Sequence, residues 1–168
     1  MNLVDVTVYY LEMLAPTGRV VPPPCEGLAV ERVAFPAVTY YRKLYDAVGR
    51  DYHWLSRRKL SDEELAEILN DPLSEVLVLK VDGADAGFAE LDARQPQDVE
   101  LVQFGLMPDF MGQGLGRWFL QQTIDHVWSK RPDRFWLHTC TLDHPAALPM
   151  YEHAGFLRYK EEQIRREL

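Results

Sequence analysis

One stretch near the middle of the chain constrains the fold more than any other: residues Met107 to Arg117, which read MPDFMGQGLGR. An apolar run from Val99 to Met107 stops at a proline, and glycines then occupy three alternate positions before a helical pattern begins. Glycine lacks a Cβ atom, so such a turn can direct several backbone N–H groups at one point. The helix that follows adds its unpaired N–H groups and the positive end of its dipole. The sequence therefore predicts an anion site, most often for phosphate, built from a strand, a glycine turn and a helix start.

Hydrophobic periodicity predicts the other elements. Strands are expected at residues 3–11, 75–81, 86–91, 99–107, 135–141 and 156–165, and helices at 37–48, 61–69, 114–128 and 145–154. Ser61 and Glu64 form a capping-box signature for the second helix, and Gly49 is expected to end the first helix as its C′ residue. Residues 28–33 could be a short second strand in a broad hairpin with the first strand.

The order of these elements predicts a single α/β domain over residues 1–168. Strands and helices interleave, but the βα repeats are too few for a doubly wound fold. We therefore expect one mixed, mostly antiparallel central sheet with helices on both faces. The strand at 99–107 is mostly apolar on both of its faces and is expected to be central. Strict alternation would place four of its residues on one face, namely Glu100, Val102, Phe104 and Leu106.

Charge and cysteine content narrow the class of protein. The 26 acidic residues outnumber the 18 basic residues, and the net charge of −8 argues against non-specific binding to nucleic acid or to anionic membranes. No apolar run approaches membrane-spanning length, and the N-terminal residues lack the basic start of a signal peptide, so a cytoplasmic location is expected. Cys25 and Cys140 have no CxxC spacing, which predicts neither a disulfide framework nor a metal site.

The glycine turn differs from the two commonest phosphate-binding motifs. No GK[ST] sequence follows it, as a P-loop would require. The next strand also offers no acidic residue for a ribose, as a dinucleotide-binding fingerprint would require. A connecting turn without a ligand is the alternative, because short glycine patterns often arise by chance.

Two motifs in the second half of the chain stand at a characteristic separation. They are Met111-x-x-Gly114-x-Gly116 before a helix, and Ala147-x-x-x-Tyr151-x-x-x-Gly155-Phe156. Together they resemble the GNAT superfamily of acyl-CoA-dependent N-acyltransferases. The resemblance covers residues 75–160 well, and the N-terminal third only through the order of its elements. It implies a GNAT-like fold and acetyl-CoA as the cofactor.

The resemblance also implies which residues bind the cofactor. The coenzyme A pyrophosphate would lie on N–H groups along the turn, those of Gly112, Gln113, Gly114, Leu115, Gly116 and Arg117. The backbone of Phe104 and Leu106, in the family's splayed central strands, would pair with the pantetheine amides. Met111 stands where the family usually has Gln or Arg, so any side-chain contribution from that cofactor-binding position is absent. His144 replaces a frequent Asn, and either hydrogen-bonds the cofactor or caps a helix.

Acyl transfer to an amine requires a neutral amine, a polarised thioester carbonyl and a proton for the leaving thiolate. By resemblance, Tyr151 would be the general acid near the cofactor sulfur, and the Leu106 N–H group would bind the thioester oxygen. Glu100 stands eleven residues before Met111, where many members carry a glutamate base. Apolar surroundings there would raise its pKa, as a base for an ammonium requires. Without the resemblance, Tyr151 would be a core aromatic and Glu100 a residue in a surface salt bridge.

Several other polar residues are weaker candidates. Glu90 is a second candidate for the base, since it could point into the acceptor cleft. His138 could face the same cleft, although a satisfied core histidine is the more common case. Arg57 and Arg58 could recognise an acidic acceptor, but a solvated face is the favoured interpretation. Asp143 is expected to cap a helix.

The expected activity is direct transfer of an acetyl group from acetyl-CoA to a primary amine of a small molecule. One alternative acceptor is a protein or peptide amine, which would require an open groove near residues 50–60. Another alternative is a non-catalytic acyl-CoA-binding module, in which Glu100 and Tyr151 would be dispensable. Many members of the family dimerise, so the resemblance allows a homodimer.

Overall fold

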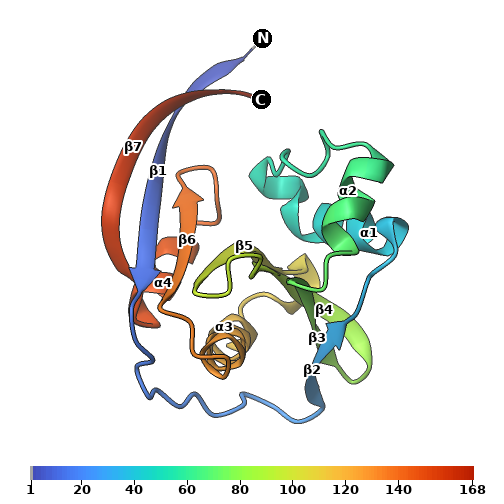
Figure 1. The fold of residues 1–168 in the computed structure, drawn as a ribbon, viewed down its shortest axis with the longest axis vertical. Helices are drawn as coiled ribbons and strands as arrows, with labels where there is room; N and C mark the ends of the chain where they lie inside the picture. Colours follow the sequence, from blue (N-terminus) through green and yellow to red (C-terminus); the bar gives the residue numbers. More distant parts are fainter. Residues whose placement is uncertain (1) are drawn as a thin grey trace.

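The computed structural model describes residues 2–168 as one seven-stranded sheet with helices on both faces (Figure 1). The strands are β1 (Leu3–Met13), β2 (Leu28–Val33), β3 (Ser74–Val81), β4 (Ala84–Asp92), β5 (Asp98–Leu106), β6 (Arg134–Cys140) and β7 (Leu157–Glu167). The helices are α1 (Val38–Gly49), α2 (Asp62–Leu69), α3 (Leu115–Trp128) and α4 (Ala147–His153), with 3₁₀ turns η1 (Arg50–Tyr52) and η2 (Pro108–Phe110).

The strand order is β2-β3-β4-β5-β6-β1-β7. Every neighbouring pair is antiparallel except β5 and β6, which are parallel. The predicted mixed, mostly antiparallel sheet is thus confirmed. No helix within residues 2–168 combines the length and the hydrophobicity that a membrane span requires.

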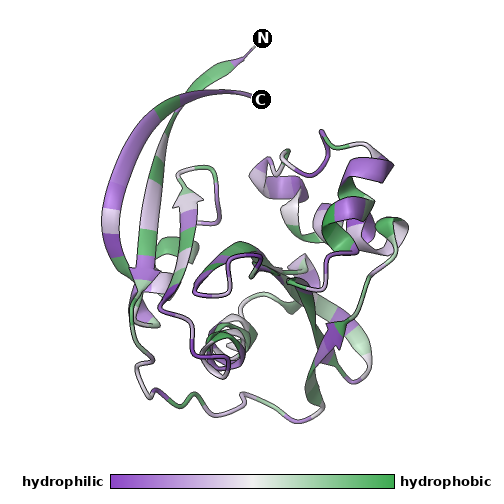
Figure 2. Ribbon diagram, in the orientation of Figure 1, coloured by the Kyte–Doolittle hydropathy of each residue, from purple (hydrophilic) through white to green (hydrophobic). Residues whose placement is uncertain are grey.

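Two apolar cores cover opposite faces of the sheet. The larger core packs α3 and α4 against the central strands, with Phe119 and Phe156 fully buried in it. The smaller core packs α1 and α2 against β3 and β4, with Tyr41, Leu65 and Phe88 fully buried. Figure 2 shows the contrast between the apolar central strands and β7, which is largely hydrophilic and exposed along its length.

Most predicted elements are present, with differences only at their ends. The capping box at α2 is confirmed. The Ser61 Oγ atom accepts a hydrogen bond from the Glu64 N–H group at 3.1 Å, and the Ser61 N–H group donates to Glu64 Oε2 at 2.8 Å. This reciprocal pair satisfies two of the helix N–H groups that would otherwise lack partners.

The predicted hairpin between residues 3–11 and 28–33 is wrong. β2 pairs with β3 at one end of the sheet, whereas β1 lies between β6 and β7. The connection at residues 14–27 runs beneath α3 from one side of the sheet to the other (Figure 1). A hairpin requires a short loop, and this segment is long enough to pass the whole sheet.

Gly49 is not a C′ residue. Its φ of −92° is negative, and the chain continues through η1 until His53 adopts the left-handed conformation with φ of 55°. A Cβ atom on Gly49 would lie 2.6 Å from the Cβ atom of Trp54. Glycine at position 49 therefore allows Trp54 to pack closely against the backbone. The chain adopts the left-handed conformation only four residues later, at His53.

β5 departs from strict alternation at one residue. In its pairing with β4, Glu90 faces Gln103, whereas the next residue, Leu91, faces Leu101. Val102 is therefore the extra residue of a β-bulge. A bulge of this kind reverses the alternation of side chains on either side of it.

The bulge changes which residues share a face of β5. Phe104 is buried in the larger core together with Leu101, and Leu106 packs against the same core. A Cβ atom on Gly105 would collide with Val48 of α1, which shows that Gly105 faces the opposite side of the sheet. The prediction that Glu100 shares a face with Phe104 and Leu106 is consequently wrong. Glu100 lies on the side of the sheet that carries α1.

Candidate functional site

A cavity of about 1010 Å³ lies where β5 and β6 separate. The parallel pairing of these strands runs from Asp98 and Arg134 only as far as Leu101 and Leu137. Both strands continue beyond these residues, and the cavity lies between the diverging segments. The segment after α1 lines one side of it, and β1 and β7 line the other.

The open edge of β5 presents backbone groups to this cavity. The Met107 N–H group donates to the carbonyl oxygen of Ala86 on β4 at 2.8 Å. Successive residues of a strand direct their N–H groups to opposite edges. The N–H and C=O groups of Phe104 and Leu106 therefore point away from β4, and both residues line the cavity. The structure thus places these two residues where an extended ligand could pair with them.

The glycine turn lies at the end of β5. Gly112 and Gly114 adopt left-handed conformations with φ of 76° and 77°. Gly116 instead lies in the first turn of α3. That turn contains no acidic residue, and no side chain of the described residues caps it. Met111, Gly112 and Gly116 line the cavity, so the turn and the helix start open directly onto it.

The remaining residues predicted to bind a cofactor lie in different surroundings. Gln113 donates from Nε2 to the Asp109 carbonyl oxygen at 3.3 Å, and Leu115 is buried in the core. The Arg117 side chain lines a separate small depression and not the cavity. Because the Leu115 side chain is buried, only the backbone of Leu115 could contact a ligand on the turn.

His144 lines the cavity at the approach to α4. Its Nδ1 atom accepts a hydrogen bond from the Ala146 N–H group at 2.9 Å, in the turn that precedes α4. Its ring also contacts the ring of Tyr52 edge-on, with centroids 5.7 Å apart. The predicted helix cap at Asp143 is wrong: its carboxylate accepts from Thr139 Oγ1 at 2.6 Å and from the Cys140 N–H group at 2.9 Å, and both donors belong to β6.

Tyr151 reaches the cavity from α4. Only 7% of the residue is exposed, and its ring packs edge-on against Phe104 and Phe156, with centroids 6.3 and 6.2 Å apart. Burial, followed by the negative charge of Asp143, raises the pKa of the Tyr151 hydroxyl. The Tyr151 hydroxyl is therefore protonated at neutral pH.

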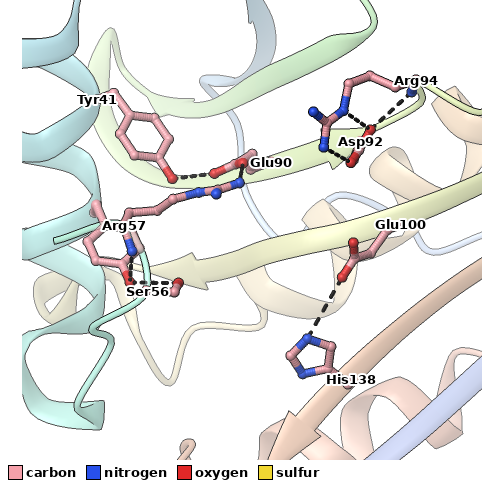
Figure 3. Close-up of polar contacts among 9 residues, drawn as sticks. Tyr41, Ser56, Arg57, Glu90, Asp92, Arg94, Glu100 and His138 are labelled. Carbon is pink, nitrogen blue, oxygen red and sulfur yellow. Dashed lines mark hydrogen bonds and ion pairs between the residues drawn. The ribbon is translucent and has the colours of Figure 1, made fainter. Parts of the chain in front are cut away.

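Glu100 and His138 face each other at the point where the two strands separate (Figure 3). Glu100 Oε1 lies 3.8 Å from His138 Nε2, and both residues line the cavity. Burial, followed by the charge of Asp92, raises the pKa of Glu100. Burial lowers the pKa of His138. Both pKa shifts favour the uncharged form of the side chain. His138 faces the cleft, and the more common alternative of a core histidine is wrong.

Glu90 is buried and bound on both sides. Its carboxylate accepts a hydrogen bond from the Tyr41 hydroxyl and forms an ion pair with Arg57 (Figure 3). Burial, and then the charge of Glu90, raise the pKa of Tyr41. Arg57 lines the cavity but Glu90 does not. The structure therefore places Glu90 behind Arg57, outside the acceptor cleft that its role as a base would require.

The solvated-face interpretation is wrong for Arg57 and confirmed for Arg58. The Arg57 side chain is only 17% exposed, whereas Arg58 is exposed and pairs with Asp46 at 2.9 Å. Sequence reasoning missed the pair between Arg57 and Glu90, because the partners come from distant segments. Residues 2–168 contain no cluster of His, Cys, Asp or Glu side chains that could hold a metal ion.

Several known proteins resemble this chain in sequence or in fold. A family model described as the Acetyltransferase (GNAT) family matches residues 41–156. A mycothiol acetyltransferase from Acidothermus cellulolyticus is 33% identical over 84 residues, which make up 49% of this chain and 24% of that protein. The chain thus spans about a quarter of the length of this relative.

Solved structures with the same fold are numerous. A GCN5-related N-acetyltransferase from Sphaerobacter thermophilus matches with a TM-score of 0.69 at 15% identity, covering 96% of this chain and 51% of that chain. An aminoglycoside acetyltransferase from a soil metagenome, in complex with sisomicin, matches with a TM-score of 0.61 at 15% identity. The match covers 77% of this chain and 88% of that chain. The ribosomal-protein-S18-alanine N-acetyltransferase of Escherichia coli matches with a TM-score of 0.63 at 20% identity, covering 79% of each chain. At such identities the likeness shows the fold alone.

The buried ion pair yields a prediction about stability. The Glu90→Gln variant leaves the Arg57 guanidinium without a carboxylate, and it should lower the free energy of unfolding by about 3 kcal/mol. The control variant Asp46→Asn breaks the exposed pair with Arg58, and it should cost less than about 1 kcal/mol. Urea denaturation followed by circular dichroism measures both. An equal decrease in the free energy of unfolding in the two variants would contradict the greater contribution of the buried pair to stability.

Proposed function

Because this chain belongs to the acetyltransferase (GNAT) family, we propose that it transfers an acetyl group from acetyl-CoA to a primary amine of a small molecule. One observation carries the proposal: the glycine turn, the open edge of β5, Glu100 and Tyr151 all meet at the same cavity. An anion site, an extended binding edge, a base and an acid are the parts that this reaction requires.

The residues around the cavity fit coenzyme A, which supplies an acetyl group activated as a thioester. Its pyrophosphate fits the N–H groups of residues 112–117, since the turn is left-handed at two glycines and the helix start is free of acidic side chains. Phe104 and Leu106 offer N–H and C=O groups to the pantetheine amides along the open edge. Met111 adds no charge, so binding rests on the backbone.

Glu100 is the proposed base, and His138 assists it. A primary amine arrives largely as an ammonium ion and must lose a proton before it can attack a carbonyl carbon. Glu100, with its raised pKa, takes that proton more readily than an ordinary exposed carboxylate would. Neutral His138 stands beside it and can accept a hydrogen bond or relay the proton.

Tyr151 is the proposed acid. When the amine nitrogen bonds to the acetyl carbon and the carbon–sulfur bond breaks, the thiolate requires a proton, which the Tyr151 hydroxyl can donate. The N–H group of Leu106 faces the cavity and can donate a hydrogen bond to the thioester oxygen as negative charge develops there. The proton gained by Glu100 and the proton lost by Tyr151 balance over one turnover, and exchange with water restores both groups.

The shape of the acceptor end supports a small molecule. Arg57 and its neighbours on one side, and β1 with β7 on the other, enclose the cavity next to Glu100. The contact between the Tyr52 ring and His144 lies at the other end of the cavity, because the Tyr52 hydroxyl is 4.0 Å from Met111 Sδ beside the glycine turn. The structural relatives include an aminoglycoside acetyltransferase and an alanine N-acetyltransferase of a ribosomal protein, so fold alone does not choose between acceptor classes. The two-sided cavity favours the small molecule over a protein segment.

Cofactor binding can be tested at the glycine turn. Gly114 has a φ of 77°, which a β-branched side chain cannot adopt without strain, so Gly114→Val should weaken coenzyme A binding by roughly 100-fold. Met111→Ala should change the dissociation constant by less than about threefold, because backbone groups bind the pyrophosphate. Isothermal titration calorimetry on folded variants measures both constants. Wild-type affinity in Gly114→Val, or a comparable loss in Met111→Ala, would refute the assignment.

The reaction itself can be tested by thiol release. Wild-type protein should release free coenzyme A from acetyl-CoA in the presence of some members of a panel of small amines. Tyr151→Phe should lower kcat by roughly 100-fold, because it removes the proton donor and keeps the ring packing. Tyr159→Phe alters an exposed tyrosine outside the cavity and should have no effect. Tight coenzyme A binding without activity on any amine would support a binding module instead.

The base can be tested by the dependence of activity on pH. The raised pKa of Glu100 means that the carboxylate forms at higher pH than the ordinary value of 4.5. The rate constant kcat/KM should therefore rise with pH through this shifted value as the base form appears. Glu100→Gln should lower kcat/KM and remove this rise of kcat/KM with pH. If the rise of kcat/KM with pH persists unchanged in Glu100→Gln and disappears in His138→Gln, His138 is the base.

A further inference from the structure

One cationic side chain in the cavity has no carboxylate partner among residues 2–168. Three arginines line the cavity, namely Arg57, Arg94 and Arg166. Glu90 neutralises the first, and Asp92 pairs with the second at 2.7 Å. The Arg166 guanidinium contacts Cys140, with Nη1 3.8 Å from Sγ, and a thiol is a weak acceptor. Its charge is therefore available to a ligand.

Asp143 is the carboxylate on the loop next to Cys140, and its hydrogen-bond donors are groups other than the Arg166 guanidinium. It accepts from the Thr139 hydroxyl and from the Cys140 N–H group. The half-buried Arg166 guanidinium thus stands beside the end of β6 without an ion pair. A guanidinium without a carboxylate partner can bind a carboxylate or phosphate through two parallel hydrogen bonds.

The register of the sheet places Arg166 on the same wall as the proposed base. Val8 of β1 pairs with Cys140 on one side and with Glu162 on the other. Alternate residues of a strand share a face, so Arg166 on β7 and His138 on β6 belong to the face that carries Val8. Val8, Ile164, His138 and Cys140 all line the cavity. This wall therefore has a guanidinium at one end and an apolar middle.

The distance along this wall can be estimated from β6. Glu100 contacts His138, and Arg166 contacts Cys140. His138 and Cys140 are two residues apart on one strand, so their Cα atoms are about 7 Å apart. A molecule whose amine lies near Glu100 would reach Arg166 with a group several bonds away.

We propose that Arg166 binds an anionic group of the acceptor, and that this group is separated from the acetylated amine by a chain of several carbon atoms. The inference rests on the proposed function and adds the acceptor class to it. An α-amino acid is too short, because its amine and carboxylate share one carbon atom. The apolar side chains of Val8 and Ile164 offer a surface for the connecting carbon chain. The anion is a carboxylate or a phosphate, since a guanidinium accommodates both.

The test compares acceptors that differ only in charge or length. The substrates are ε-aminocaproate, γ-aminobutyrate and glycine, with n-hexylamine and n-butylamine as uncharged-tail controls. The KM for ε-aminocaproate should be about tenfold lower than that for n-hexylamine, and glycine should gain nothing from its carboxylate. An aminoalkyl phosphate of the same length identifies the anion. Tighter binding of either anion supports the proposal and names the preferred group.

Matched arginine variants separate recognition from structure. Arg166→Gln should raise the KM for ε-aminocaproate about tenfold, to the value for n-hexylamine, and leave kcat and the KM for n-hexylamine unchanged. Arg165→Gln is the control, because Arg165 is 75% exposed and pairs with Asp5 at 3.2 Å on the opposite face. It should change none of these constants. Arg166→Lys, which keeps the charge, should restore part of the preference.

Three results would overturn the inference and leave the proposed function intact. They are acetylation without any preference for the anionic acceptors, an equal effect of Arg166→Gln on charged and uncharged amines, and weaker coenzyme A binding in Arg166→Gln. The last result would assign Arg166 to the cofactor. If wild-type protein acetylates no amine at all, the proposed function fails and this inference fails with it.

Discussion

The separation of two neighbouring parallel strands is the constraint on which the candidate site depends. Backbone groups in a sheet ordinarily pair with the adjacent strand, and pairing between β5 and β6 stops at Leu101 and Leu137. Beyond that point β5 has an open edge, which a ligand with amide groups can complete. The two separated strands also lead into the glycine turn before α3 and into the segment before α4. The separation of the two strands therefore brings the glycine turn, the open edge of β5 and Tyr151 to a single cavity.

The bulge at Val102 determines which face of the sheet the side chains at each end of β5 occupy. Before the bulge, Glu100 faces the α1 side of the sheet and lines the cavity. After it, Phe104 turns into the core on the other face and supports the ring of Tyr151. The proposed base and the packing that positions the proposed acid thus come from one strand and lie on opposite faces. Regular alternation would have put Glu100 on the face of the buried Phe104 side chain.

The sequence predicted what depends on local patterns and missed what depends on distant partners. Periodicity identified nearly every strand and helix, and glycine spacing identified the turn, because both are properties of neighbouring residues. The position of β1, the Val102 bulge and the ion pair of Arg57 with Glu90 depend on segments far apart in the chain. One signal was available: a glutamate between Ala89 and Leu91, in an apolar strand, requires a buried partner. Its identity could not be read from the sequence, because Arg57 lies in an irregular connector.

The position of β1 has a consequence for how this protein folds. β1 is synthesised before β6 and β7, yet it lies between them, and Thr7 hydrogen-bonds Gln163 across 156 positions of sequence. Contacts of such high sequence separation form slowly, since a long loop must close first. The strands from β2 to β5 can pair with neighbours as they leave the ribosome, while β1 must wait with both edges open. The wall that carries Arg166 is then the last part to be assembled, so the proposed acceptor contact should form after the proposed coenzyme A turn.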